Sequence, residues 1–187
     1  EATVPPTWAN LRDMKESYDV SIPHRAYGYF TVFAFDSTPD DIMGKLKKIC
    51  IESIENQVKK LDGEYQEYKK INKSERKEKI YYEPVVMSFN ELCDTIRAKD
   101  RAGFEKFYED TYKDAVAKVN SGESNFPSAT IDVMEAVLDY SGIQYPITII
   151  GFAPPYYPAV HSDMVKGKEG FGTKAFKFVS ELSENQF

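Results

Sequence analysis

The sequence predicts an α+β fold for its 187 residues. Apolar segments of strand length lie near residues 26–35, 80–88 and 145–153, amphipathic helical patterns separate them, and 42% of the residues are hydrophobic, enough to fill one core. We expect these three strands to form a small, mainly antiparallel sheet that is packed with amphipathic helices. The formal net charge of −6 disfavours nucleic acids and anionic membrane surfaces as partners.

Residues 1–25 predict an extended arm, because prolines interrupt this part and little periodicity is visible. A short helical turn is expected around Leu11–Lys15. The strand 26–35 follows, and both of its faces carry apolar side chains. This pattern predicts a central strand that is covered on both sides.

The start of this strand also has a feature of RNA-recognition domains, in which a basic residue, a glycine and alternating aromatic side chains bind bases. Arg25, Tyr27, Gly28 and Tyr29 fit that order, whereas Ala26 stands where a glycine is expected. Only 24 residues precede this motif, too few for the upstream aromatic strand of such a domain. A packed core strand is the favoured interpretation, and RNA binding is kept as an alternative.

A long helix is predicted over residues 39–70. Thr38 is a candidate N-cap, Pro39 suits the first helical position and Asp41 the third. At 1.5 Å per residue the helix would be about 48 Å long, whereas a compact domain of this size has a radius of gyration of about 16 Å. The helix therefore either breaks near Gly63 or projects and leaves part of its apolar stripe in need of a partner. The basic segment 69–79 reads as a solvated turn, with a phosphate-binding patch as the alternative.

The second half predicts helices between two strands. Pro84 puts the early part of the strand 80–88 at a sheet edge, and Ser88 with Glu91 forms a capping box for a short helix. Two further helices are expected over about 104–119 and 127–141, each stopped by a glycine. The strand 145–153 ends in PPYYP, which must leave the sheet, and a last helix is expected over 173–182.

The two cysteines and the apolar segments bear on the compartment. Cys50 lies on the apolar stripe of the long helix and Cys93 follows the capping box, so two buried free thiols are expected. Free thiols suit a reducing compartment, and we expect a cytoplasmic protein. Prolines interrupt the longest apolar stretch, ITIIGFAPPYYPAV, so no membrane span is expected.

Motifs for catalysis are weak. His161 and Asp163 could place two ligands on zinc, but such a site needs three or more protein ligands and the other histidine is His24. A histidine in an exposed loop is the better interpretation of His161. The sequence has no G-x-S-x-G motif and no glycine-rich phosphate loop, so the residues alone identify no catalytic set.

Three stretches together resemble a known family: PPTWANLRDMKESYDVSIPHRAYGYF, the strand and helix after it, and YPITIIGFAPPYYP. They are similar to the arginine-utilisation type of protein within the zinc-dependent aminoacylase, carboxypeptidase and dipeptidase superfamily. The similarity runs from about Val4 to Pro158; its first and last stretches are fairly specific, and its helical middle is generic.

The resemblance implies a role as the inserted lid and dimerisation domain of such an enzyme, with a ferredoxin-like sheet over residues 26–158. Residues 159–187 would return toward a catalytic domain that is not in this chain. The zinc, cobalt or manganese ions would belong to that domain, so the resemblance implies no catalytic residue, metal ligand or cofactor here. The expected partners are the protein's own catalytic domain and a second copy, with no nucleic acid or membrane.

Two departures from the family pattern limit this implication. A histidine-containing segment that opens the lid in relatives would lie before Glu1, so the sheet would be incomplete. The strand equivalent to 26–35 often carries an arginine that contacts substrate, whereas here it carries Tyr and Phe. We therefore expect this chain to be inactive alone and derive no substrate.

The candidate site is the turn after the last strand, as a hinge or a surface that faces the substrate cleft. Its residues are Pro154, Pro155, Tyr156, Tyr157 and His161. A rigid strand terminator is the alternative for this turn. The competing function is a non-catalytic binding module, either RNA-recognition-like or regulatory with a small ligand.

Overall fold

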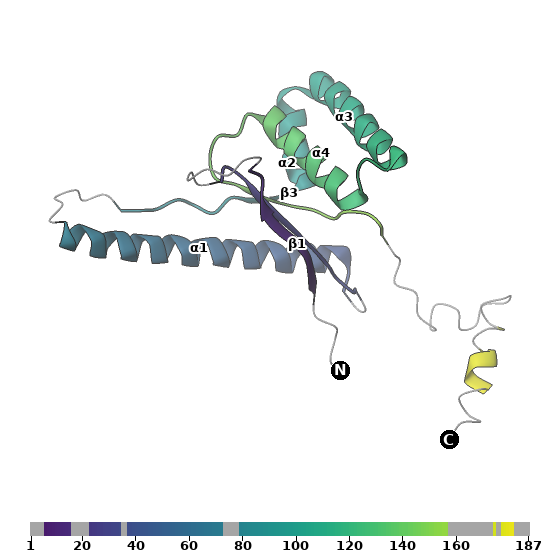
Figure 1. Cartoon of the computed structure of the whole chain (residues 1–187), viewed down its shortest axis with the longest axis horizontal. Coiled ribbons are helices and arrows are strands. Elements are labelled where there is room, and N and C mark those ends of the chain that lie inside the picture. The colour runs from purple at the N-terminus through teal and green to yellow at the C-terminus, as the bar shows by residue number, and fades with distance from the viewer. Residues whose placement is uncertain are drawn as a thin grey trace. The chain divides into compact units, whose positions relative to one another are not determined.

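The fold is known from a computed structural model that describes residues 6–15, 23–34, 37–72, 79–156, 174 and 177–181 (Figure 1). Its mixture of helices and small sheets confirms the α+β class. The chain divides into two compact units, residues 1–155 and 156–187. The elements of the first unit are β1 (Thr7–Asp13), β2 (Ala26–Thr31), α1 (Pro39–Ile71), β3 (Val86–Ser88), α2 (Phe89–Lys99), α3 (Arg101–Ser121), α4 (Phe126–Ser141) and β4 (Thr148–Ile150). In the second unit, residues 174 and 177–181 are helical, within the predicted range 173–182.

The prediction of one mainly antiparallel sheet is wrong for the described residues. The strands form two separate two-stranded sheets: β1 with β2, antiparallel, and β3 with β4, parallel. Three helices connect β3 to β4, and a crossover of that length allows the two strands to run in the same direction. Among the described residues no ferredoxin-like sheet forms.

The antiparallel pair corrects two further predictions. The helical turn expected around Leu11–Lys15 is wrong, because residues 7–13 form β1 and Met14 N–H bonds to the carbonyl of Arg25 at 3.0 Å. The prediction that β2 is central and covered on both faces is also wrong. β2 pairs with β1 alone among the described strands, and each of its residues is either half-buried or exposed. Pairing with a strand close in sequence outweighs the local helical preference.

One face of this pair is aromatic. The rings of Trp8 and Phe30, opposite each other in the register, lie 5.1 Å apart edge to face. Gly28 makes this possible, because a Cβ atom there would lie 2.8 Å from the Trp8 ring and 3.1 Å from the Leu11 side chain. Trp8 and Leu11 remain 62% and 71% exposed.

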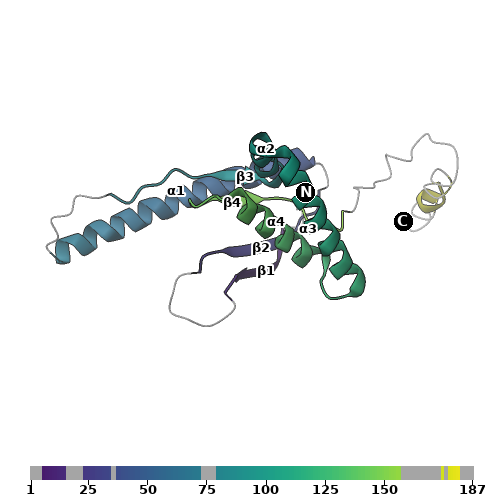
Figure 2. The ribbon, with the colours of Figure 1, turned by 90° about the horizontal axis from the view of Figure 1, so that it is seen from above.

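Helix α1 begins as predicted and is unbroken. Thr38 and Asp41 form the capping box with Pro39 in the first turn, and the helix passes through Gly63 to Ile71. Its 33 residues span about 50 Å. β3 and β4 lie beside it (Figure 2), and the segment before β3 is fixed by a bond from Ile80 N–H to Asp62 Oδ1 at 2.9 Å. Val58 is the buried residue of α1, at 6% exposure.

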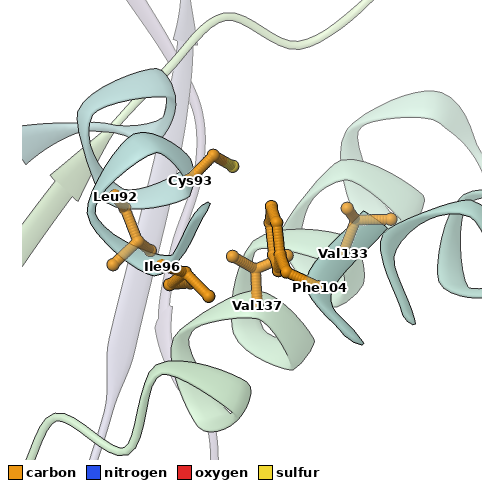
Figure 3. Packing of buried hydrophobic residues seen from close by; sticks show 6 residues of the cluster. All are labelled: Leu92, Cys93, Ile96, Phe104, Val133 and Val137. Atoms are coloured by element: carbon orange, nitrogen blue, oxygen red, sulfur yellow. The ribbon is translucent and has the colours of Figure 1, made fainter. Parts of the chain in front are cut away.

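The core of the first unit lies among α2, α3 and α4. Figure 3 shows its members pointing toward one another: Leu92, Cys93, Ile96, Phe104, Val133 and Val137. Phe104, Leu92 and Val137 are fully buried. Caps fix the helix ends as predicted: Ser88 and Glu91 cap α2, and Gly122 and Gly142 end α3 and α4 with positive φ. Both cysteines are free, Cys93 buried and Cys50 half-buried.

None of the helices in the described ranges combines the length and the apolar character that crossing a bilayer requires.

Candidate functional site

The predicted hinge follows β4 at the edge where the two parallel strands end. β3 ends at Ser88, the N-cap of α2, and β4 ends beside it at Ile150. A Cβ at Gly151 would lie 3.5 Å from Phe89 Cβ and 3.7 Å from Met134 Cε, so the chain leaves the sheet in contact with α2 and α4. The carboxyl edge of a parallel sheet is where α/β proteins commonly bind ligands.

Three of the five predicted site residues are described. Pro154 is half-buried, Pro155 and Tyr156 are exposed, and the Pro154–Pro155 peptide bond is cis. Tyr157 and His161, with Asp163, lie outside the described residues. The division into compact units falls between Pro155 and Tyr156, inside the predicted hinge. The hinge role itself stays a prediction.

The polar groups at this sheet edge are paired with one another. Glu91 accepts a bond from Ser88 N–H at 2.7 Å and receives Lys47 Nζ of α1 at 2.9 and 3.1 Å. The Ser88 backbone bond, followed by the Lys47 bond, lowers the pKa of the Glu91 carboxyl. Glu91 is therefore an ionised link between α1 and α2 and is unsuited to act as a general base near neutral pH.

Other groups with catalytic potential are few in the described part of the chain. Burial raises the pKa of the Cys93 thiol, which keeps it protonated and a poor nucleophile. Within the described ranges no three or more His, Cys, Asp or Glu side chains gather where they could hold a metal ion. A small groove of about 100 Å³ lies against α1, lined by Ile54, Tyr82, Val85, Pro146, Ile147 and Thr148. It is smaller than the roughly 300 Å³ of the smallest usual ligand pockets.

The residues of the RNA-recognition-like pattern are engaged within the protein. The Arg25 guanidinium bonds to Glu135 at 3.0 Å and to Asp139, both on α4. The Arg12 guanidinium lies 5.5 Å from the centre of the Tyr27 ring. The basic residue of the pattern thus faces two carboxylates, and it ties the antiparallel pair to α4.

This ion pair predicts a pH-dependent stability. The Arg25 hydrogen bond lowers the pKa of Asp139 below its ordinary value of 3.8, so the unfolded state binds the proton more tightly. The stabilisation is complete above pH 3.8 and is lost as the pH falls through the lowered pKa. Because Asp139 is 62% exposed, solvent screening limits the effect, and Arg25→Gln should lower the free energy of unfolding by about 1 kcal/mol at pH 7.

The measurement is urea unfolding of wild type and Arg25→Gln at pH 7, 5 and 3. The difference between the two proteins should shrink at pH 3. Lys48→Gln, which removes an intrahelical pair of 3.8 Å on α1, is the matched control and should change little. A difference for Arg25→Gln that stays constant across this range would contradict the assigned ion pair.

A further surface feature is an apolar stripe on α1, which the sequence pattern predicted only in part. We call it the outer face; its residues are Ile42, Leu46, Ile49, Ser53, Gln57, Leu61, Tyr68 and Ile71. Ile49, Leu61, Tyr68 and Ile71 are 58%, 48%, 59% and 79% exposed, so nothing in the described part of the chain covers them. The spacing of apolar residues at every third or fourth position predicted the stripe. It could not tell which of these residues pack against the rest of the chain and which stay exposed.

Comparison with known proteins gives one relative. The chain is 28% identical over 165 residues to YqjN, an uncharacterised protein of Bacillus subtilis (strain 168). The match covers 87% of this chain and 28% of the length of that relative. No protein-family model and no solved structure matches the chain.

Proposed function

We propose that this chain is the lid and dimerisation module of a metal-dependent amide hydrolase, a peptidase or amino-acid N-deacylase of the arginine-utilisation type. The observation that carries the proposal is the uncovered apolar surface: Ile49, Leu61, Tyr68 and Ile71 on α1 and Trp8 and Leu11 on the antiparallel pair. Exposed apolar patches often mark sites of contact with other polypeptide, and this surface suits such a contact. The resemblance of the chain to lid domains, and a match to 28% of a longer relative, support a part of a larger protein.

In this proposal the chemistry belongs to the parent's catalytic domain, whose metal ions would activate a water molecule against an acyl-amino acid or a peptide bond. The described residues hold no group suited to a metal, so no step at the metal is assigned to them. The work of this module is to close over the substrate, exclude water and hold the subunit contact. The division of the chain between Pro155 and Tyr156 suits a hinge at which closure occurs.

An activity assay tests the first part of the proposal. The 187-residue chain is incubated with Zn²⁺, Mn²⁺ or Co²⁺ and N-acetyl amino acids, and the released amine is measured. We expect no turnover above the metal alone. Turnover that depends on the protein would contradict the proposal, and His161→Ala would then reveal whether His161 takes part.

Sedimentation at micromolar concentration tests the second part, with a dimer as the expected result. A monomer under these conditions would remove the dimerisation role and leave the lid role to be judged on its own.

A module for single-stranded RNA is the second candidate, favoured by one observation. Trp8, which is 62% exposed, lies edge to face with the half-buried Phe30 of the neighbouring strand, and an exposed aromatic ring is a surface on which a base can stack. The net charge of −6 and the engagement of Arg25 by two carboxylates weigh against it. Retention on single-stranded RNA that falls with salt, and that Trp8→Ala abolishes, would favour this candidate over the lid.

A further inference from the structure

Six of the eight residues of the outer face of α1 are arranged symmetrically about Glu55, whereas Leu46 and Ile71 have no apolar counterpart of this kind on the helix. Ile42 and Tyr68 lie equally far from Glu55 along the helix, and so do Ile49 and Leu61 and the polar pair Ser53 and Gln57. At 100° per residue these six residues fall within a sector of about 120°, on the side turned away from the buried Val58. Two such helices in antiparallel orientation would set apolar against apolar and polar against polar.

The charges at one edge of the outer face show a second symmetry, centred one residue further along at Asn56 and with opposite signs. Lys45 and Glu67 lie eleven residues to either side of Asn56, and Glu52 and Lys60 lie four residues to either side. An antiparallel copy of α1 therefore meets opposite charges along this flank, whereas a parallel copy in register meets identical ones, such as Lys45 against Lys45. Glu52 and Lys60 are also paired within α1, with Lys48 at 3.8 Å and with Glu64 at 3.9 Å. Lys45 interacts electrostatically with Asp41, and neither Lys45 nor Glu67 is in a salt bridge with another described residue.

The charge pairs also bear on the register of the two antiparallel helices. A shift of seven residues in the sum of paired positions brings Glu52 next to Glu67 of the other copy, or, in the other direction, Lys45 next to Lys60, like charges in both cases. In the alignment with opposite charges the paired positions run from Ile42 to Tyr68, about 39 Å of the helix. Charge pairs at such flanking positions select partner and orientation in helix pairs.

We propose that α1 pairs antiparallel with α1 of a second copy of this chain, with a two-fold axis at the level of Glu55. The inference rests on the proposed dimerisation role and specifies its surface. The outer faces bury each other around Ile49 against Leu61 and Ile42 against Tyr68, and the polar Ser53 and Gln57 lie at the centre. The side of α1 that contacts β3 and β4 stays as it is in the single chain.

Cysteine cross-linking tests the alignment in a Cys50→Ser background. Chains with Ile49→Cys are mixed with chains with Leu61→Cys under mild oxidation, and each variant is also oxidised alone. We expect disulfide-linked dimers in the mixture and none from either variant alone. Glu55→Cys is the matched control, because it lies at the level of the two-fold axis but on the opposite side of the helix, and it should not cross-link.

The other possible outcomes correspond to different arrangements of the two chains. Cross-linking of Ile49→Cys with itself would show a parallel pair and overturn the inference. A dimer in sedimentation without the mixed cross-link would place the contact elsewhere, which overturns the inference and leaves the dimerisation role. A monomer in sedimentation, without the mixed cross-link, would overturn both.

A charge reversal gives an independent test on surface residues. Lys45→Glu opposes Glu67 of the other copy at both symmetric contacts, and the dissociation constant should rise about tenfold. Adding Glu67→Lys restores opposite charges and should restore the affinity. If the double variant is as weak as the single one, Lys45 and Glu67 do not meet across the pair and the inference fails.

Discussion

Phe104→Ala should lower the free energy of unfolding by about 3–5 kcal/mol. Phe104 is fully buried where α2, α3 and α4 meet, with the rings of Tyr108 and Tyr140 at 5.7 and 5.8 Å and the Arg97 guanidinium at 5.4 Å. Removing the ring leaves a cavity between α2, α3 and α4, and it also removes the packing that holds these helices together. Loss of that magnitude is a large part of the stability of an ordinary domain.

The measurement is equilibrium urea unfolding followed by circular dichroism of the helices. Phe126→Ala is the matched control, since Phe126 is 50% exposed at the start of α4 and should change stability by about 0.5 kcal/mol or less. If Phe104→Ala costs no more than this control, the three helices do not share the core described above.

Replacing Ile49 and Leu61 together by glutamate should raise the dissociation constant of the dimer at least about 100-fold. Four carboxylates would then face one another between the two helices, among apolar side chains. The fold of each chain should survive, because both positions are about half exposed in the single chain. The effect therefore separates association from folding.

Lys59→Glu is the control for this variant. It changes the net charge by the same amount, but it lies on the side of α1 turned away from the outer face, and it is exposed. Sedimentation of wild type, the double variant and the control should show dissociation for the double variant only. Equal dissociation of the control would mean that net repulsion, and not the outer face, governs the association.

The sequence predicted helix boundaries well because their signals are local. Thr38 with Asp41 and Ser88 with Glu91 form capping boxes whose partners are three residues apart, and both are present. Gly122 and Gly142 end their helices for an equally local reason, a positive φ. Such features depend little on the rest of the fold.

Strand pairing could not be predicted in the same way. β2 has apolar residues on both faces, which suggests a central strand, but its neighbour is β1, where a helical turn was expected. Thr148–Ile150 pairs with Val86–Ser88 about 60 residues earlier, and nothing in either stretch specifies that partner or its direction. Of the candidate site, the sequence indicated the break at PPYYP, but not that Ser88, Glu91 and Lys47 are joined beside it.

The link between Lys47 and Glu91 has a mechanical consequence. It couples the first third of α1 to the helix that carries the core, while the remaining 24 residues to Ile71 extend about 36 Å beyond it. β3 and β4 and the bond from Ile80 to Asp62 hold the helix further along, so that the stretch beyond Asp62 is only the last nine residues to Ile71, about 14 Å. A partner bound along the outer face would therefore transmit force to the strands and to α2 together.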